Sequence, residues 1–482
     1  MRWPSARRAL LVSAVLALAG CAHYPLNDVL GAPAVVGAYQ FPDAATTPGA
    51  NGDALFVCLT FSGGGTRAAA LAYGVMERLK TTPITWQGAT KSLLDEVDCI
   101  SSVSGGSFTA AYYGLFGDRL FTDFRRRFLD RNIERELTRQ LLNPMMLGRL
   151  ASPYFSRSDL AAELYDRTIF EGRSFAALAG RRPFVILNAT DLATGRRFEF
   201  TQEQFDMIGS DLSRYPVARG VAASSAFPLL LTPISLQNHP APTGWQPPQE
   251  YRSALADFAH NRRRWAWARA RLDYHERKAE RPWVHLSDGG MADNIGLRPL
   301  EAAYRFASGF IRPRINQRRV ERFVLIAVNA RTDPQEQVSR TESPPGAVSV
   351  AYKASTIAMD NYSFDSLQLM KDLEKDAYQA RRYVADCQAR LDRHCAKPPR
   401  LPVPPALRTC LVEVDFEALA DEATRRRFLD LPTTFALPPG DIDALIAVGK
   451  QLLEESPAFQ RLLHSLAGAP PPTVADADPN CG

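Results

Sequence analysis

The chain has 482 residues, 46% of them hydrophobic, which is enough to bury one large core and a smaller satellite domain and excludes a disordered chain or a coiled coil. The formal net charge is +5, and it becomes +2 (54 basic minus 52 acidic residues) once Arg2, Arg7 and Arg8 are discounted as part of a leader. This near-neutral balance gives no reason to expect nucleic acid as a partner.

The first twenty residues are typical of an export signal. A basic start precedes an apolar run from Ala9 to Gly20 that is too short to span a bilayer as a stable helix. The run ends in Leu18-Ala19-Gly20-Cys21, which resembles the bacterial lipobox and implies a lipid anchor on Cys21. The alternative is ordinary secretory cleavage that leaves Cys21 unmodified. Because Ala22 is not the aspartate that usually retains lipoproteins at the inner membrane, we expect an exported protein anchored to the outer membrane.

Strands and helices alternate from residue 54 onward. Two strand–turn–helix units come first, and later strands are separated mostly by helical patterns. The predicted strands are 54–61, 96–103, 183–191, 283–290, 322–330 and 410–416, and the first two helices are 68–80 and 106–117. Such alternation predicts an α/β fold with a mainly parallel central sheet, helices on both faces and a helical C-terminal extension.

Three consecutive glycines, Gly63, Gly64 and Gly65, form the turn after the first strand. Without side chains, the backbone N–H groups of this turn can face an incoming oxygen, helped by the dipole of the following helix. The triplet can equally be a simple turn. The Gly-Lys-Ser/Thr ending of a phosphate-binding P-loop is absent.

Ser104 ends the second strand, within the sequence SVSGG. A nucleophile elbow needs small residues around its serine because the strained turn crowds the neighbouring positions. Here Ser102 stands where the first glycine of the usual pattern would be. The alternative makes Ser104 only the N-cap of the next helix.

The third motif is Asp288-Gly289-Gly290, at the end of a later strand. A carboxylate held there can reach a serine on an adjacent strand, although a turn-forming aspartate is the simpler alternative. The glycine turn, Ser104 and Asp288 all lie at strand ends, where α/β sheets build their sites. Their conjunction predicts one shared site.

Together, Gly63-Gly64-Gly65-Thr66-Arg67, the SVSGGS around Ser104 and Asp288-Gly289-Gly290 resemble the patatin-like phospholipase family. The resemblance covers roughly residues 54–305, and the later helices fit a continuation seen in bacterial lipoprotein members. It implies that Ser104 is the nucleophile, Asp288 the second member of a dyad and the Gly63–Gly65 loop the oxyanion hole.

The activity implied is that of a lipid acyl hydrolase of the phospholipase A or lysophospholipase type, working through an acyl-enzyme without cofactor or metal. A non-phospholipid esterase or thioesterase, and an inactive membrane-tethered lipid-binding protein, are the alternatives. Arg67 is a candidate phosphate contact or a helix-start arginine paired with a carboxylate. A Ser-His-Asp triad is disfavoured because His285, three residues before Asp288 on a strand, faces the other way.

The chain divides accordingly into a leader, a tether, a catalytic domain, its continuation and a tail. These are the signal peptide at 1–20, a flexible tether at 21–53, the catalytic domain at 54–310, its helical continuation at 311–465 and a Pro-rich tail at 466–482.

Two further segments have open roles. Residues 250–283 carry nine Lys or Arg and five Asp or Glu interleaved with tryptophans, which suits either an interfacial membrane helix or a surface helix packed on the core. The apolar segment 141–150 is either a lid or a packed connection. Ser224 and Ser225 are expected to pack, and Asp293 and Asn294 to serve as turn and capping residues.

Six cysteines remain beside Cys21, an even number that permits disulfides in an exported protein. Cys58 and Cys99 lie in apolar strands and are expected to be buried thiols. Cys387 and Cys395 are the better bridge candidates, with each other or with Cys410 or Cys481.

Overall fold

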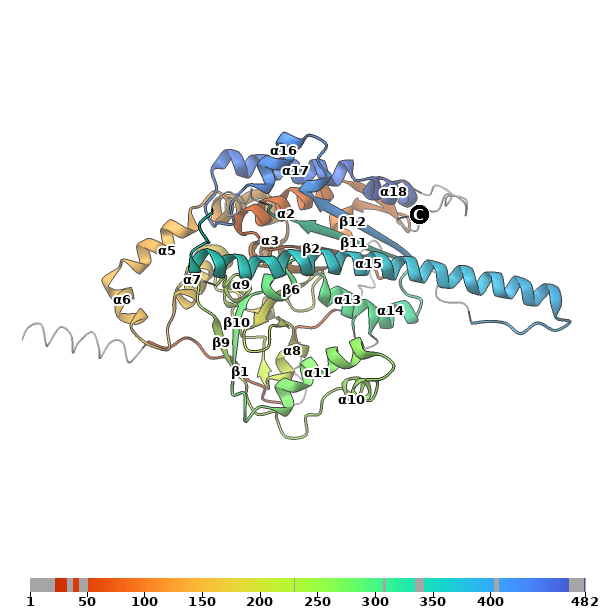
Figure 1. Cartoon of the computed structure of the whole chain (residues 1–482), viewed down its shortest axis with the longest axis horizontal. Helices are drawn as coiled ribbons and strands as arrows, with labels where there is room; N and C mark the ends of the chain where they lie inside the picture. The colour runs from red at the N-terminus through yellow and green to blue at the C-terminus, as the bar shows by residue number, and fades with distance from the viewer. Residues whose placement is uncertain are drawn as a thin grey trace, which may run out of the picture.

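A computed structural model of the chain describes residues 22–32, 38–42, 51–228, 230–306, 309–333, 342–402, 407–467 and 481 (Figure 1). The predicted signal peptide, the lipidation site Cys21 and most of the predicted Pro-rich tail lie outside these residues. The described residues form a central sheet between layers of helices.

The central sheet has eight strands in the order β12-β11-β2-β5-β6-β10-β9, with β7 also paired to β6. The strands are β2 (Leu55–Phe61), β5 (Val97–Val103), β6 (Phe184–Asp191), β7 (Arg196–Glu199), β9 (Ile234–Gln237), β10 (Trp283–Asp288), β11 (Arg322–Asn329) and β12 (Arg408–Asp415). Strands β12, β11, β2, β5 and β6 run parallel to one another, whereas β7 and β10 are antiparallel to β6. The predicted α/β fold with a mainly parallel sheet is confirmed.

Helices cover both faces of this sheet. Those of the first half are α2 (Gly65–Lys80), α3 (Gly105–Phe116), α4 (Leu120–Phe124), α5 (Ile133–Leu141), α6 (Pro144–Leu150), α7 (Arg157–Tyr165), α8 (Gln202–Met207) and α9 (Val217–Ser224). Those of the second half are α10 (Gln249–Leu255), α11 (Arg262–Glu276), α12 (Gly290–Asp293), α13 (Arg298–Arg305), α14 (Arg312–Asn316), α15 (Ala347–His394), α16 (Glu422–Leu429), α17 (Pro439–Glu455) and α18 (Pro457–Leu466). The predicted C-terminal helical extension is therefore confirmed.

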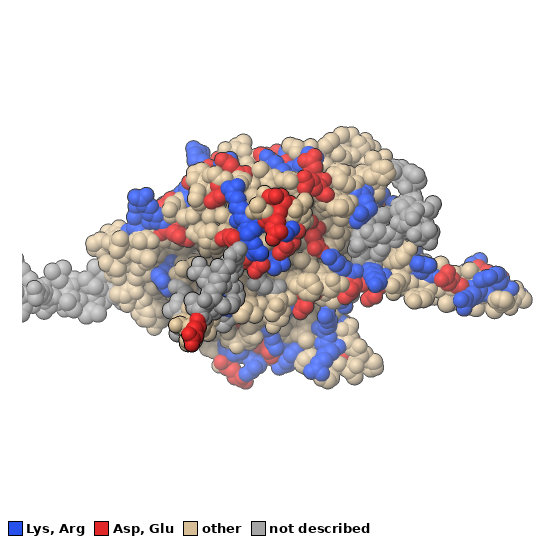
Figure 2. All heavy atoms as spheres, turned by 45° about the horizontal axis from the view of Figure 1, so that its top comes forward, with Lys and Arg blue, Asp and Glu red and all other residues tan. Residues whose placement is uncertain are grey.

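Helix α15 is 48 residues long, crosses the body and projects beyond it (Figure 1). Its projecting end carries Lys and Arg mixed with Asp and Glu (Figure 2). In the part of the chain that the structure describes, every helix is too short or too polar to cross a membrane.

The strands that lead to the predicted site are apolar runs buried on both faces. All seven residues of β2 and all seven of β5 are buried, as expected for inner strands of a sheet covered by helices. The register places Cys58 opposite Cys99, with Cα atoms 4.7 Å apart, and the two form a disulfide. The expectation of two buried thiols is therefore wrong, because strand pairing brings them together across 41 residues of sequence.

A second disulfide joins Cys410 to Cys481. Cys387 and Cys395, predicted as bridge partners, are free and exposed. Cys387 lies on α15 and Cys395 directly follows the last residue of that helix, so the intervening helical turns separate the two by about 10 Å along the axis, which is beyond the reach of a disulfide. The prediction failed because that segment continues a helix rather than forming a loop.

Part of the predicted tether packs on the domain. Leu30 and Tyr39 are buried, and the Tyr39 hydroxyl donates to the carbonyl of Val185 at 2.7 Å. Strand β1 (Asp28–Val29) pairs with β8 (Ser210–Asp211). These contacts show that residues 22–32 and 38–42 pack on the domain rather than forming a flexible linker. The prediction failed because an Ala- and Pro-rich composition does not indicate which of its few apolar residues will be buried.

The segment 250–283 folds mainly as α10 and α11 and buries part of its aromatic residues, while Phe258 and Trp283 stay exposed. Trp267 stacks on Tyr251 and contacts Phe306, with ring centroids 4.7 and 4.8 Å away, and Tyr274 is buried. This packing favours the surface-helix alternative over an interfacial membrane helix.

Candidate active site

Ser104 occupies a strained turn between β5 and α3. Its φ of 49° and ψ of −119° lie in a region that serine rarely adopts, and its side chain does not cap the helix. A Cβ at Gly105 would collide with the carbonyl oxygen of Gly65, and one at Gly106 would lie 2.6 Å from the Cβ of Phe61. The geometry is that of a nucleophile elbow, which requires the two glycines, and it rules out Ser104 as a simple N-cap.

Asp288 reaches the same place from an antiparallel strand. We expected all three motifs at the ends of parallel strands, but β10 runs opposite to β6 and stops where Asp288 faces Ala189. The neighbouring residue Asn188 pairs with Val103 on the other side of β6. Asp288 and Ser104 therefore meet at one level of the sheet and line one cavity, and the Ser104 side chain is close enough to lower the pKa of Asp288.

The carboxylate of Asp288 is held firmly. Its Oδ1 accepts the N–H of Gly290 at 2.8 Å, while its backbone carbonyl accepts the hydroxyl of Thr190 at 2.7 Å. Only 3% of the residue is exposed, and this burial raises the pKa of Asp288 to about 6, against the opposing effects of the Gly290 N–H and the Ser104 side chain. A carboxylate with a pKa near neutrality suits a general base.

The glycine turn faces Ser104. The N–H of Gly63 already donates to the carbonyl of Asn294 at 2.9 Å. No acceptor among the described residues receives the N–H of Gly64 or Gly65, which begin α2 with φ values of 141° and 59° that favour glycine. Of the three predicted oxyanion residues, Gly64 and Gly65 therefore have backbone N–H groups available to a ligand. Gly63 must be glycine for a different reason, because a Cβ at this position would lie 2.5 Å from Asn294 Oδ1.

Ser224, at the end of α9, links the two halves of the site. Its hydroxyl accepts the N–H of Ser104 at 2.9 Å and donates to the carbonyl of Asn188 at 2.7 Å, while its own carbonyl accepts the N–H of Gly289 at 3.1 Å. We expected this serine only to pack. Its positioning role was missed because the hydrogen bonds join segments 36 to 120 residues apart, and no local pattern signals them.

The serine that replaces the first glycine of the elbow is accommodated by the same network. The hydroxyl of Ser102 accepts from Ser107 at 3.1 Å and donates to the carbonyl of Ile186 at 3.4 Å. Ser225 packs as expected, with its hydroxyl bonded to the carbonyl of Val221. The departure at position 102 therefore leaves the elbow intact.

Arg67 is buried and committed to protein acceptors. Its guanidinium donates to the carbonyls of Ala330 and Leu431 at 3.0 and 2.6 Å and to the Thr433 hydroxyl at 3.1 Å. These contacts use the guanidinium for two carbonyls and a hydroxyl, while Arg67 also lines the cavity of Ser104, so a phosphate contact there stays a prediction. Arg67 clamps two distant loops against α2.

Other predicted residues have structural partners. Asp293 Oδ2 accepts the N–H of Arg298 at 2.8 Å, which is the expected capping role. His285 pairs with Ser235 on β9, with Nδ1 and Oγ 2.8 Å apart. His285 thus takes its hydrogen-bonding partner from β9 rather than from the pair formed by Ser104 and Asp288.

A cavity of about 110 Å³ opens over the site. Ser104, Asp288 and Gly64 form its floor, and residues from beyond position 310 complete its walls. Those later residues are Ala330, Arg331, Thr332, Lys353, Thr356, Met359 and Thr433. Helix α15 is therefore part of the site. Among the described residues, no group of three His, Cys, Asp or Glu side chains could hold a metal ion.

Comparison with known proteins identifies a matching family and several similar structures. A family model described as patatin-like phospholipase matches residues 59–301, half of the chain. The fold is similar to human GIVD cytosolic phospholipase A2, with a TM-score of 0.43 and 14% identity over 86% of this chain and 63% of that chain, so the chain spans less than two thirds of that protein. It is also similar to VipD from Legionella pneumophila, with a TM-score of 0.27 and 10% identity over 92% of this chain and 71% of that chain. Among curated proteins, none matches the chain.

Proposed function

The chain belongs to the patatin-like phospholipase family of lipid hydrolases, and on this premise we propose that it cleaves an acyl ester of a phospholipid with a Ser104–Asp288 dyad. The observation that carries this proposal is that the buried carboxylate of Asp288 and the side chain of Ser104, which is held in a strained turn, face one cavity. A serine hydroxyl beside a buried base is an activated nucleophile.

The first half of the reaction forms an acyl-enzyme. Asp288 accepts the proton of Ser104 as the oxygen attacks the ester carbonyl, and the N–H groups of Gly64 and Gly65 stabilise the tetrahedral oxyanion. The proton then passes from Asp288 to the leaving alcohol. In the second half, Asp288 takes a proton from the water that attacks the acyl-enzyme. It then returns this proton to the oxygen of Ser104 as the bond to the acyl group breaks and the fatty acid leaves.

The charge of the cavity wall favours a phospholipid over a neutral ester or a thioester. Arg331 and Lys353 line the cavity that holds Ser104. Arg331 is 3.9 Å from its nearest carboxylate, Glu417, which is a loose pair. Two cationic side chains at the mouth can attract a phosphate headgroup while Gly64 and Gly65 engage the ester.

The function is tested by an activity-based fluorophosphonate label and by lipid products. Covalent labelling of Ser104, together with fatty acid and lysophospholipid released from a bacterial lipid extract, supports the proposal. Release of fatty acid from neutral esters or thioesters alone would support the esterase alternative. Lipid binding without labelling would support the inactive lipid-binding protein.

Hydrolysis should weaken at acidic pH because Asp288 accepts a proton only when ionised. Burial raises its pKa from 3.8 to about 6, so kcat/KM should be level above about pH 7 and fall about tenfold per pH unit below the pKa. A pH–rate profile on an uncharged ester measures this directly. Activity that stays level down to about pH 4.5, near the ordinary pKa of a carboxyl, would contradict Asp288 as the base.

We also propose that the body meets a membrane through the turn between α5 and α6, α6 itself and the segment that follows it. Leu142 in that turn and Met145 on α6 are 74% and 73% exposed, which is unusual for large apolar side chains. The first described residues dock on the segment after α6: the N–H of Tyr24 donates to the carbonyl of Tyr154 at 2.8 Å, and His23 stacks on its ring. The proposed anchor at Cys21 would therefore leave the body at this apolar edge.

An exported location is consistent with the two disulfides, which form in oxidising compartments. The outer-membrane anchor on Cys21 stays a proposal.

Polar replacement in α6 and the turn before it should weaken vesicle binding. In a Cys21→Ser background, which removes the site of the proposed lipid, Leu142→Ser with Met145→Ser should lower vesicle partitioning at least about tenfold, since each buried apolar side chain contributes roughly 1.5–3 kcal/mol. Co-sedimentation with phospholipid vesicles measures the partition. Tyr383→Ser, at an equally exposed aromatic residue on the projecting end of α15, is the matched control. Equal losses in both variants would exclude α6 and that turn as the docking surface.

A further inference from the structure

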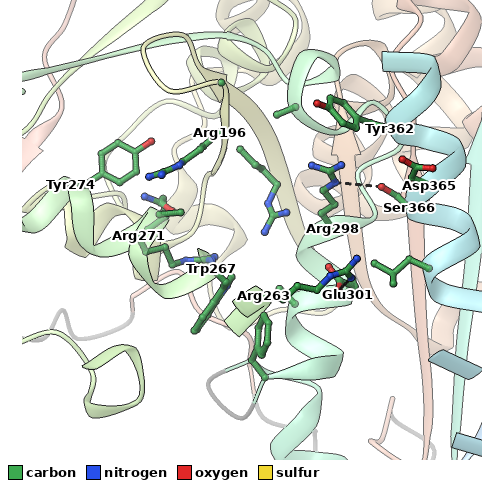
Figure 3. A pocket seen from close by; sticks show the side chains of 18 residues that line it. Arg196, Arg263, Trp267, Arg271, Tyr274, Arg298, Glu301, Tyr362, Asp365 and Ser366 are labelled. Atoms are coloured by element: carbon green, nitrogen blue, oxygen red, sulfur yellow. Dashed lines mark hydrogen bonds and ion pairs between the residues drawn. The ribbon is translucent and has the colours of Figure 1, made fainter. Parts of the chain in front are cut away.

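A second and larger cavity, of about 450 Å³, shares no lining residue with the cavity of Ser104. Its walls come from the β6–β7 hairpin, α8, α11, α13 and the middle of α15 (Figure 3). The volume is within the range of small-molecule sites. The proposed hydrolysis uses none of its lining residues.

Five arginines line this cavity: Arg196, Arg197, Arg263, Arg271 and Arg298. Only two acidic residues, Glu301 and Asp365, share the lining. Arg196 and Arg271 lie on one side and Arg298 on the other (Figure 3). The guanidinium groups therefore surround a common space from separate elements of the fold.

Carboxylates behind the lining neutralise part of this charge. Arg196 pairs with Asp273 at 2.7 Å, whereas Arg197 and Arg271 share the single carboxylate of Glu199 at 2.8 and 2.9 Å. Arg263 has only a long contact, 3.5 Å, with Glu301, which is shared with Arg305, so the five lining arginines stand against only two carboxylates in the lining itself. An anionic ligand is therefore favoured.

Arg298 is compensated at longer range by the buried carboxylate of Asp293. Within the described residues, no carboxylate lies within ion-pair distance of its guanidinium, which donates from Nε to the hydroxyl of Ser366 on α15 at 3.3 Å. The guanidinium also lies over the ring of Tyr362, 4.8 Å from the centroid. The stacking fixes its plane and leaves its terminal nitrogens available at the cavity.

Arg271 supplies an unsatisfied buried donor. The residue is 8% exposed, and its Nε has no hydrogen-bond partner among the described residues. The indole N–H of Trp267, beside it in the lining, is likewise buried without an acceptor in the described part of the chain. Leaving a buried donor unpaired costs about 1–3 kcal/mol, so a ligand oxygen at this point would be stabilised.

Aromatic side chains complete the cavity. Trp267, Tyr274, Phe306 and Tyr362 line it together with the arginines. Phosphate oxygens suit the fork of a guanidinium, whereas aromatic walls suit an apolar or ring-containing portion of the same ligand. A free inorganic anion would leave the aromatic walls unused.

From these observations we infer that the second cavity binds a phosphate monoester, with its phosphate between Arg271 and Arg298 and its organic part against the aromatic walls. The inference is independent of the proposed hydrolysis. The same chemistry occurs in a soluble phosphate ester and in the headgroup of an anionic lipid such as phosphatidic acid.

The test uses the full chain with Ser104→Ala, which prevents turnover of the probe and blocks any contribution from the acyl-enzyme. Glycerol 3-phosphate is titrated by calorimetry, and vesicles of phosphatidylcholine with and without phosphatidic acid are tested by co-sedimentation. Binding of glycerol 3-phosphate identifies a soluble ester as sufficient. Binding only to the vesicles that contain phosphatidic acid identifies the lipid headgroup.

Arg298→Gln should weaken binding of glycerol 3-phosphate, or of the vesicles that contain phosphatidic acid, at least tenfold, depending on which of the two the parent chain binds. Arg263→Gln, at an exposed arginine of the same lining, should weaken it less and does not disturb the buried pairs. Arg277→Gln, an arginine paired with Glu280 just after α11, should leave it unchanged. No binding in either arm, or equal binding by the Arg298→Gln and Arg277→Gln variants, would overturn the inference.

Discussion

Replacing Ser104 with alanine should lower kcat for ester hydrolysis by about 10⁶-fold, the loss typical of removing a serine nucleophile. No other hydroxyl can replace it, because Ser102, Ser107 and Ser224 are buried and bonded to one another or to backbone carbonyls. The measurement is single-turnover hydrolysis of a chromogenic ester. Residual activity would come from binding and from the N–H groups of the glycine turn alone.

Asp288→Asn should cause a loss of similar size, and the double variant should be no slower than either single variant. The two side chains act as one unit, so removing the second after the first has no further effect. Additive losses would show that Asp288 acts separately from Ser104, and a loss of less than about tenfold in Asp288→Asn would contradict its role as the base.

Stability provides the control for this pair. Because burial raises the pKa of Asp288, the folded protein holds a proton that the unfolded chain releases between about pH 4 and 6. Ionised Asp288 therefore lowers the free energy of unfolding above pH 6. Asp288→Asn should be at least as resistant to urea as the parent chain at pH 8, so its loss of activity is separable from unfolding.

The local sequence was sufficient to predict the elements that form the site. The apolar runs that became β2 and β5 and the small residues after Ser104 each have a local physical cause, namely burial on both faces and crowding at the elbow. The meeting of Ser104 with Asp288 was predicted for the wrong reason. It depends on β10 running antiparallel to β6 and ending with Asp288 opposite Ala189. The residue pattern of a six-residue strand does not indicate the direction in which the strand runs.

Contacts between segments distant in sequence account for the features that were not predicted. Arg67 donates to carbonyls more than 260 residues away, and the N–H of Gly63 is taken by Asn294. Likewise, Met359 on α15 lines the cavity although the helix lies outside the region of family resemblance. Hydrogen bonds of this kind depend on the finished fold, so residue types near each motif cannot reveal them.

Removing the disulfide between Cys58 and Cys99 should lower the free energy of unfolding by about 4 kcal/mol, given the 41 residues that separate them. Cys58→Ala with Cys99→Ala is the suitable change, because both sites are fully buried and alanine adds no polar group. Urea unfolding at matched pH measures the effect. The matched control, Cys387→Ala with Cys395→Ala, removes two exposed free thiols and should shift stability by less than about 0.5 kcal/mol.

The position of this bridge connects stability to the site. Strand β2 leads into the glycine turn and β5 leads into Ser104, so the bridge fixes the register of the two strands that present the oxyanion donors and the nucleophile. Reduction of the parent chain should reproduce this loss of stability. Reduction of the Cys58→Ala, Cys99→Ala variant should change its stability only through the remaining disulfide, between Cys410 and Cys481. If the variant instead unfolds at the same urea concentration as the control, then strand pairing and core packing alone hold the glycine turn against Ser104.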